Sequence, residues 1–306
     1  MRHLLTMADL TAVEIERIFS IAEDLKSKYQ KGLREALLPG RVLALLFEKP
    51  SLRTRVSFEA GIAHLGGSSL FLGEDVGFFG RRESPADFGR VLSSYVDAIV
   101  VRSKRHETVE TLAEVATCSV INGLTDQSHP CQAMADLFTM RELLGGKLKG
   151  HTVAWVGDAN NVARSLAVGC GRLGMRFVMA TPKAYQFSQQ FMNHIRQAVP
   201  ELDLVVTTNP VDAVRDAAVV YTDVWASMGQ ESEMESRRAA FAPYQVNAAL
   251  MSHAQHGCFF MHCLPARRGQ EVTDEVLDSP QSVVVQQAEN RMHIQKGILA
   301  WLLGRE

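Results

Sequence analysis

A turn between two apolar segments gathers groups that bind anions. Residues 47–59, FEKPSLRTRVSFE, follow the apolar run Val42–Phe47, which predicts a buried strand, and they open a helical pattern of apolar residues. Ser51 stands where that helix would be capped, and Arg53 and Arg55 follow it. Free backbone N–H groups, the positive end of a helix and permanently charged guanidinium groups together favour a phosphate. The segment predicts an anion site, although a capped surface helix with solvated arginines would use the same residues.

Further polar side chains stand where other apolar runs end. They are Arg102 after Ala98–Val101, His129 before the Pro130 helix, Asp223 with the loop that follows it, and Cys263 in His262-Cys-Leu-Pro265. Each of these residues can also be explained without a function, as a solvated arginine, a helix cap, a packing loop or an inert buried thiol. Open α/β sheets bind ligands beyond the carboxyl ends of their strands. Five such segments in one chain therefore predict a ligand cleft between two domains.

Composition restricts the class of protein. A chain of 306 residues is long enough for two domains, and 32 Lys+Arg against 34 Asp+Glu gives no basic stripe of the kind that binds nucleic acid. Five cysteines without a C-x-x-C pair indicate reduced thiols and a cytoplasmic location. Thr11-x-x-Glu14 predicts a capped first helix in place of an apolar leader, and no run is long enough to span a membrane.

Short apolar runs alternate with helical patterns in two blocks, which predicts the α/β class with two doubly wound parallel-sheet domains. Strands are expected at Val42–Phe47, Ser69–Leu72, Ala98–Val101, Cys118–Ile121, Thr152–Val156, Arg176–Ala180, Leu202–Thr207, Val219–Asp223 and Cys258–His262. Helices are expected at Ser51–Leu65, Ser84–Tyr95, Glu107–Ala116, Pro130–Leu144, Asn160–Leu173, Lys183–Val199, Val211–Ala217, Tyr244–His253 and Ala288–Leu303. The glycine-rich segment 145–150 separates a first domain, 1–144, from a second, 145–285. The turn at 156–164, VGDANNVAR, lacks G-x-G-x-x-G and so disfavours a dinucleotide cofactor.

Four ordered motifs together resemble the aspartate/ornithine transcarbamylase family, and within it the ornithine carbamoyltransferases. The motifs are Ser51-Leu-Arg-Thr-Arg55, His129-Pro-Cys-Gln132, Asp223-Val-Trp-Ala-Ser-Met-Gly229 and His262-Cys-Leu-Pro265. The resemblance covers essentially the whole chain. It implies a carbamoyl-phosphate domain rejoined by a C-terminal helix (286–306), an ornithine domain, a homotrimer with shared active sites that could assemble further, and no cofactor or metal.

The resemblance also assigns the site residues. Carbamoyl phosphate is expected at Ser51, Leu52, Arg53, Thr54, Arg55, Arg102, His129, Gln132 and Arg291. Ornithine is expected at Asn161, Asp223, Ser227, Met228, Cys263 and Leu264. Arg102, His129 and Thr54 would stabilise the oxyanion while Cys263 orients the amine and eases its deprotonation. The implied reaction of arginine metabolism joins carbamoyl phosphate to the neutral δ-amine of L-ornithine, giving L-citrulline and phosphate, and its physiological direction stays open.

Two departures from the family pattern leave alternatives open. Leu52 stands where a small or hydroxyl residue is common, and Phe78-Phe79-Gly80 replaces a usual Gln-Leu-Gly in a loop that reaches a neighbouring subunit. One alternative is a transcarbamylase for another amine, such as putrescine, lysine or an N-acylated ornithine, but Ser227-Met228-Gly229 argues against it. The other is a catalytically silent paralogue, for which the Phe78 departure is the support.

Phe78 is expected to bury its ring against an adjacent subunit. Two large apolar side chains in a glycine-flanked loop are a liability unless they are covered, and covering one ring is worth roughly 1.5 to 3 kcal/mol. We predict that Phe78→Ala weakens trimer association in sedimentation experiments, whereas Phe78→Gln keeps catalytic activity. An undiminished trimer in the first variant and an inactive second variant would contradict this prediction.

Overall fold

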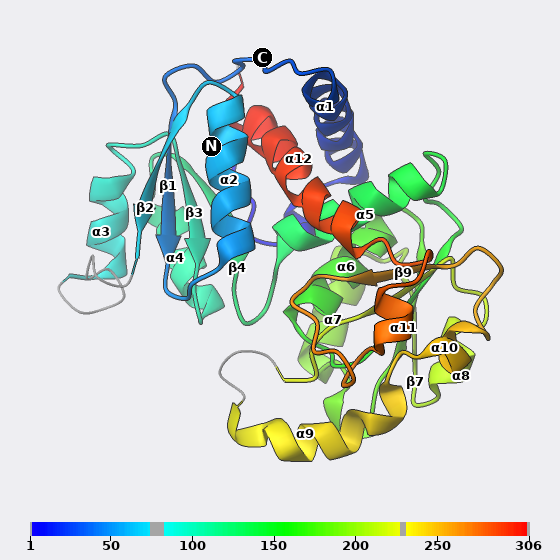
Figure 1. Cartoon of the computed structure of the whole chain (residues 1–306). Coiled ribbons are helices and arrows are strands. Elements are labelled where there is room, and N and C mark those ends of the chain that lie inside the picture. The colour runs from blue at the N-terminus through cyan, green and yellow to red at the C-terminus, as the bar shows by residue number, and fades with distance from the viewer. Residues whose placement is uncertain (1, 74–82, 227–230, 305–306) are drawn as a thin grey trace. The chain divides into compact units, whose positions relative to one another are not determined.

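The chain divides into two compact units (Figure 1). The structure, a computed structural model, describes residues 2–73, 83–226 and 231–304. Unit 1 comprises Met1–Phe138 and Glu289–Glu306, and unit 2 comprises Thr139–Ala288. Helix α5 (Pro130–Leu143) takes the chain out of unit 1 and α12 (Val284–Leu303) brings it back. Each boundary between the units falls inside one of these helices. The observed boundaries therefore differ by a few residues from the domain limits expected at 144 and 285.

Unit 1 is a four-stranded parallel sheet in the order β2-β1-β3-β4. Its strands are β1 (Val42–Phe47), β2 (Ser68–Leu72), β3 (Ala98–Arg102) and β4 (Ser119–Leu124). Its other helices are η1 (Met7–Asp9), α1 (Ala12–Gln30), α2 (Leu52–His64), α3 (Pro85–Leu92) and α4 (His106–Val115). Thr11 and Glu14 form the predicted capping box of α1.

The central strands of this sheet are apolar on both faces, which is typical of parallel strands covered by helices. On one face of the sheet, Ala44, Leu46 and Ile99 pack with α3 and α4. The alternate residues Leu43 and Leu45 face the opposite side of the sheet and are fully buried as well. Unit 1 thus encloses the inner strands and fixes where their carboxyl ends emerge.

Unit 2 is a five-stranded parallel sheet in the order β7-β6-β5-β8-β9. Its strands are β5 (Thr152–Val156), β6 (Arg176–Ala180), β7 (Asp203–Thr207), β8 (Val219–Thr222) and β9 (Phe259–His262). Its helices are α6 (Asn161–Arg172), η3 (Lys183–Tyr185), α7 (Gln189–Ala198), α8 (Pro210–Val214), η4 (Glu231–Glu233), α9 (Met234–Phe241), η5 (Ala242–Tyr244), α10 (Ala248–Met251) and α11 (Asp274–Leu277).

The structure corrects several expected helices of unit 2. The helix expected at Lys183–Val199 is divided into η3 and α7, because the Ser188 hydroxyl caps a new helix by accepting from the Phe191 N–H. The one expected at Tyr244–His253 is η5 followed by α10, which begins at the Asn247 cap. Helices α9 and α11 were not expected, since their short charged segments have weak apolar periodicity. None of the described helices has the length and hydropathy needed to cross a membrane.

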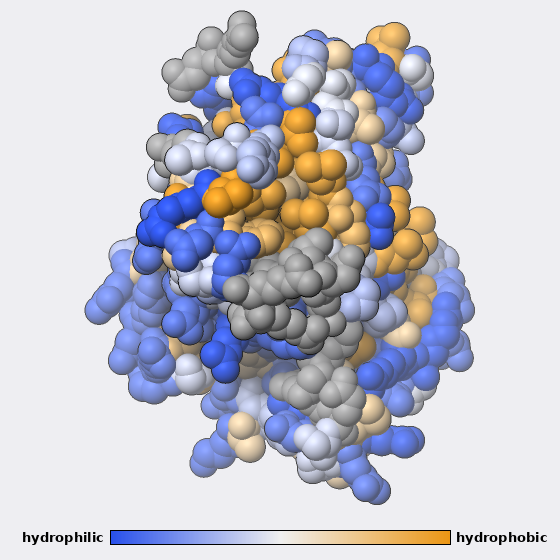
Figure 2. Space-filling model, turned by 90° about the vertical axis from the view of Figure 1, so that its left-hand side faces the viewer, coloured by the Kyte–Doolittle hydropathy of each residue, from blue (hydrophilic) through white to orange (hydrophobic). Residues whose placement is uncertain are grey.

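An apolar surface lies along β2, the edge strand of unit 1. We define the apolar edge as Leu52 and Val56 on α2 with Leu70 and Phe71 on β2, all of which are exposed. Figure 2 views the molecule from the side on which α3 lies in Figure 1 and shows apolar side chains gathered on this face. An open strand edge with apolar side chains is usually covered by a partner.

Helix α12 is buried around almost its whole circumference from His293 to Leu299. Gly297 allows this packing, because a Cβ there would lie 2.8 Å from the Ile18 carbonyl oxygen. The neighbouring Lys296 is buried as well, with Nζ 3.4 Å from the Leu25 carbonyl oxygen and 5.1 Å from the centre of the Tyr29 ring. Burial, and secondarily the charge of Arg34, lowers the pKa of Lys296 to about 8. Folding therefore works against the charged form of this amine.

We predict that Lys296→Met raises the free energy of unfolding at pH 7 by about 1 to 2 kcal/mol, less than the full pKa shift would give because solvent screens part of the charge. The folded pKa of about 8 lies below the unfolded value of 10.5. The advantage of the variant is therefore complete below pH 8 and disappears as the pH rises to 10.5. Denaturant titrations across this range measure it. Exposed Lys31→Met is the control, and a gain that is the same at pH 7 and pH 10.5 would contradict the assignment.

Candidate active site

The strand order of unit 1 reverses between β1 and β3, and the predicted anion segment lies at this reversal. Phe47 is paired with Arg102, so the loop after β1 and the end of β3 leave the sheet at the same edge. That loop leads to Ser51, the N-cap of α2, whose Oγ accepts a hydrogen bond from the Thr54 N–H at 3.3 Å. Reversal points and helix N-termini both bind anions in α/β proteins.

Arg291, which α12 contributes, is fixed at this edge by two buried side chains. Its Nη2 donates to Thr54 Oγ1 at 3.1 Å and its Nη1 donates to Gln132 Oε1 at 2.7 Å. Thr54 Oγ1 also accepts from the Ser51 hydroxyl at 3.0 Å, and Gln132 Nε2 donates to Asp136 Oδ1 at 2.8 Å. This network brings together Ser51, Thr54, Gln132 and Arg291, which the family resemblance assigned to carbamoyl phosphate, and adds Asp136. Their contact with carbamoyl phosphate stays a prediction.

Arg102 carries a buried charge beside other cations. Its residue is 6% exposed, and its Nε has no hydrogen-bond partner in the part of the chain that the structure describes. Burial, reinforced by the charges of Arg291 and Arg53, lowers the pKa of Arg102 to about 10. Neither Arg53 nor Arg102 forms an ion pair with a carboxylate among the described residues. An arrangement of cations that repel one another is stabilised by a bound anion.

His129 stands directly before α5, at the end of the segment that follows β4. Its backbone carbonyl accepts from the N–H groups of Gln132 and Ala133 at 3.1 and 3.2 Å, which anchors it to the first turn of the helix. Burial, together with the charges of Arg291 and Arg102, holds the pKa of His129 well below its ordinary value of 6.5. The imidazole is thus neutral at pH 7 and retains one N–H that can donate to a polarised carbonyl oxygen.

Two residues of the anion motif are directed elsewhere. The Arg55 Nε donates to Glu59 Oε1 at 3.0 Å, and its guanidinium group lies 3.8 Å from the centre of the Phe71 ring. Leu52 is 76% exposed and belongs to the apolar edge. A phosphate contact from either side chain stays a prediction.

In unit 2, the strand order reverses between β5 and β8, where Asp223 and the first residues of α6 emerge. The Asn160 side chain caps α6 by accepting from the N–H groups of Val162 and Ala163, both at 3.0 Å, while its Nδ2 donates to Asp223 Oδ2 at 2.7 Å. Asp223 Oδ1 accepts from the Val224 N–H at 2.8 Å and from the Cys263 thiol at 3.1 Å. A largely buried carboxylate is thereby fixed in one orientation.

The turn that carries Cys263 and Leu264 is held by a buried pair behind it. Leu264 has a φ of 55°, a left-handed conformation that costs energy for a leucine. Its N–H donates to His262 Nδ1 at 2.9 Å, and His262 Nε2 lies 3.3 Å from Glu271 Oε1. The Arg267 N–H donates to the same Glu271 oxygen. The pair fixes a strained turn that directs Cys263 toward Asp223.

Asp223, His262 and Cys263 place possible metal ligands within 4.8 Å of one another. However, both ring nitrogens of His262 are engaged, one by the Leu264 N–H and the other by Glu271. The thiol and the Asp223 carboxylate also bond to each other. Each of the three side chains already has hydrogen-bond partners, so the cluster suits an orienting hydrogen-bond network better than a metal centre.

Asn160, which makes the contact to Asp223, was not among the site residues expected from the sequence. The neighbouring Asn161 is the first residue of α6, and its contact with ornithine stays a prediction. The strand-to-helix position of the Asn160-Asn161 pair was a signal for an N-cap that could have identified Asn160. Ser227 and Met228, like Phe78, lie outside the described residues.

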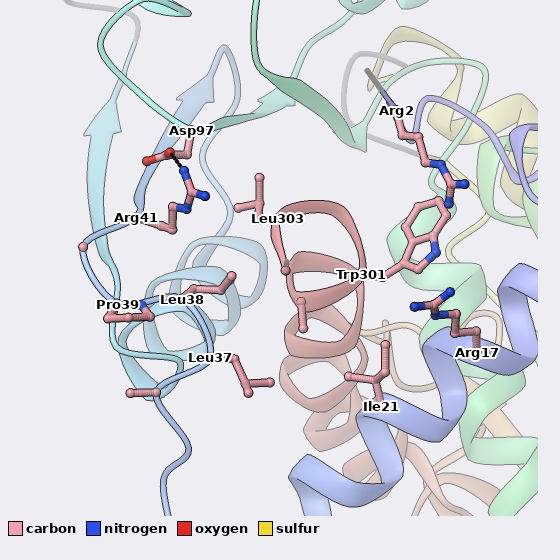
Figure 3. A pocket seen from close by; sticks show the side chains of 14 residues that line it. Arg2, Arg17, Ile21, Leu37, Leu38, Pro39, Arg41, Asp97, Trp301 and Leu303 are labelled. Carbon is pink, nitrogen blue, oxygen red and sulfur yellow. Dashed lines mark hydrogen bonds and ion pairs between the residues drawn. The ribbon is translucent and has the colours of Figure 1, made fainter. Parts of the chain in front are cut away.

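A cavity of about 810 Å³ lies elsewhere in unit 1 (Figure 3). Its walls include Arg41 and Asp97, an ion pair whose members stand immediately before β1 and β3, and Trp301 near the end of α12. It therefore opens at the amino ends of the strands, opposite Ser51 and Arg102. The cavity is separate from the candidate site.

Comparisons with known proteins match both units. Residues 2–142 match the model of the aspartate/ornithine carbamoyltransferase carbamoyl-P binding domain, and residues 149–302 match that of the Asp/Orn binding domain. An ornithine carbamoyltransferase from Anoxybacillus flavithermus is 50% identical over 304 residues, covering 99% of this chain and 96% of the relative.

Solved structures agree with these matches. The ornithine carbamoyltransferase from Pyrococcus furiosus has a TM-score of 0.95 at 51% identity, covering 99% of this chain and 97% of that one. The Thermus thermophilus structure of the same description has a TM-score of 0.88 at 40% identity, covering 98% of both chains. Together with the sites at both strand reversals, these likenesses show that the chain belongs to the aspartate/ornithine carbamoyltransferase family.

Proposed function

We propose that this chain transfers the carbamoyl group of carbamoyl phosphate to the δ-amine of L-ornithine, giving L-citrulline and phosphate. The observation that carries the proposal is the group of Arg53, Arg102 and Arg291 at the N-terminus of α2, where Arg102 is buried beside other cations. The similarity of the whole chain to ornithine carbamoyltransferases supports the choice of substrates. Formation of citrulline by the purified chain tests it, and no product from these two substrates would contradict it.

The unit 1 site suits the carbamoyl donor. The Ser51 turn and Arg53 would hold the phosphate, which gains charge as it leaves, because backbone N–H groups and a guanidinium fork are preorganised for it. Arg102, His129 and Thr54 would surround the carbonyl oxygen. Since His129 is neutral, it would polarise that oxygen by donating a hydrogen bond. Such donors stabilise the oxyanion that develops when an amine attacks.

The unit 2 site suits ornithine. The fixed Asp223 carboxylate is a natural partner for the α-ammonium group, with Asn161, Ser227 and Met228 proposed as further contacts. The Cys263 thiol donates to Asp223 and would thereby keep a defined direction beside the δ-amine, which must be neutral to attack. Leu264 would line the same place through its fixed turn.

For the assembly, we propose a homotrimer with shared active sites. The apolar edge on α2 and β2 supports it, because this surface adjoins the Ser51 turn and is suited to burial against another copy. We further propose a cytoplasmic location, which the five free cysteines support.

Arg53→Ala is predicted to lower kcat/KM for carbamoyl phosphate by about 2 to 4 kcal/mol of transition-state stabilisation, because a charged contact to the departing phosphate is lost. The matched control is Arg55→Ala, two residues along the same helix, whose guanidinium group is engaged by Glu59 and Phe71. Steady-state citrulline assays measure both. A loss in Arg55→Ala that equals or exceeds the loss in Arg53→Ala would refute this division of roles.

Asp223→Asn is predicted to raise the KM for ornithine and lower kcat, while leaving carbamoyl phosphate binding close to wild type, because the charge that balances the α-ammonium group is removed. Calorimetric titration with carbamoyl phosphate and initial rates at varied ornithine separate the two effects. Exposed Asp212→Asn is the control. Loss of carbamoyl phosphate binding with normal ornithine kinetics would show that the substrates are assigned to the wrong units.

A further inference from the structure

Arg237, on α9, connects the two loops of unit 2 that carry the proposed ornithine site. It is buried, and its Nη1 donates to Asp158 Oδ2 at 2.9 Å and to the Trp225 carbonyl oxygen at 3.0 Å. Asp158 belongs to the loop after β5 and Trp225 to the loop after β8. One guanidinium group therefore joins the ends of the two strands between which the sheet order reverses.

Other contacts prevent this guanidinium group from moving. Its Nε donates to Glu233 Oε2 at 2.8 Å, one turn earlier, and its Cζ lies 4.9 Å from the centre of the Tyr185 ring. The Trp225 ring stacks on Phe241 of the same helix, with 6.2 Å between the ring centres. Helix α9 is thus attached to the loop after β8 by a hydrogen bond and by a stacked pair.

The charge of Arg237 affects the carboxylates of this site. Asp158 is largely buried, which raises its pKa, and the neighbouring Asp223 raises it further while Arg237 opposes the rise. Two residues after Asp158, Asn160 donates to Asp223. Without Arg237, the buried Asp158 would lose its counter-ion and its pKa would rise further, so that it would take up a proton or attract another cation, such as the ammonium group that Asp223 is proposed to bind.

We propose that Arg237 is a positioning residue for ornithine, which holds the loops after β5 and β8 together and neutralises Asp158 so that Asp158 does not compete with Asp223 for the ammonium group. This inference rests on the proposed function of the Asp223 site. Arg237 itself touches no reacting atom, so its influence is on ornithine binding and reaches the chemistry through Asp223.

The test compares Arg237→Met with Arg238→Met, since Arg238 is the exposed neighbour on the same helix. The expected result for Arg237→Met is a KM for ornithine raised about tenfold or more, with the KM for carbamoyl phosphate within about twofold of wild type. Arg238→Met is expected to match wild type in both. If Arg237→Met does not fold, Arg237→Lys keeps the charge without the guanidinium fork and should show a smaller rise in the same KM.

The double variant Arg237→Met/Asp158→Asn separates charge from general structural damage. Removing the unpaired carboxylate should bring the raised ornithine KM of Arg237→Met part of the way back to the wild-type value. An unchanged ornithine KM in Arg237→Met, an equal rise in both KM values, or a double variant no better than the single one would overturn the inference. If the wild-type chain forms no citrulline, the proposed function fails and this inference fails with it.

Discussion

Repulsion among three guanidinium groups at one sheet edge is the constraint around which unit 1 is organised. Arg102 comes from the end of β3, Arg53 from the first turn of α2 and Arg291 from α12, which returns to unit 1 after the whole of unit 2. Burying Arg102 and Arg291 together, with the charge of Arg53 nearby, costs free energy, as the lowered pKa of Arg102 indicates. The network of Thr54, Gln132 and Asp136 and the covered sheet hold them in place. On the proposed assignment, a phosphate-bearing substrate would relieve the repulsion, so that stability given up in folding would become affinity for the ligand.

Unit 2 places a group of the opposite charge at the equivalent position, the point where its strand order reverses. Its sheet also reverses beside its first strand, but the group fixed there is the Asp223 carboxylate, bound by Asn160, the Val224 N–H and Cys263. On the proposed assignment, one unit is preorganised for an anion and the other for an ammonium group. Carbamoyl transfer needs both, since the donor carries a phosphate and the acceptor a free α-amino group. Preorganisation removes the need to reorient dipoles as charge develops at the reacting carbon.

The sequence predicted the parts of this arrangement that depend on local patterns. Val42–Phe47 and Thr152–Val156 are strands with the expected limits, because continuous apolar runs bounded by turn residues permit few alternatives. Ser51 is the expected cap. Contacts between distant segments were beyond such reasoning: Arg291 was assigned through family resemblance alone, and the Arg237–Asp158 pair joins residues whose separate surroundings give no sign of the other. Arg55 was expected to bind phosphate together with Arg53, and its contacts with Glu59, one turn away, and with Phe71 on β2 could not be predicted from the motif.

The central claim is that the buried cations of unit 1 form the carbamoyl phosphate site. Calorimetric titration of the purified chain with carbamoyl phosphate, in wild type and in Arg102→Met, tests it most directly, because methionine keeps an apolar stem in the buried position while removing the charge. We predict one site per chain in the wild type and binding weakened at least about a hundredfold in a variant that remains folded by circular dichroism. Equal affinity of the two proteins for carbamoyl phosphate would contradict the claim.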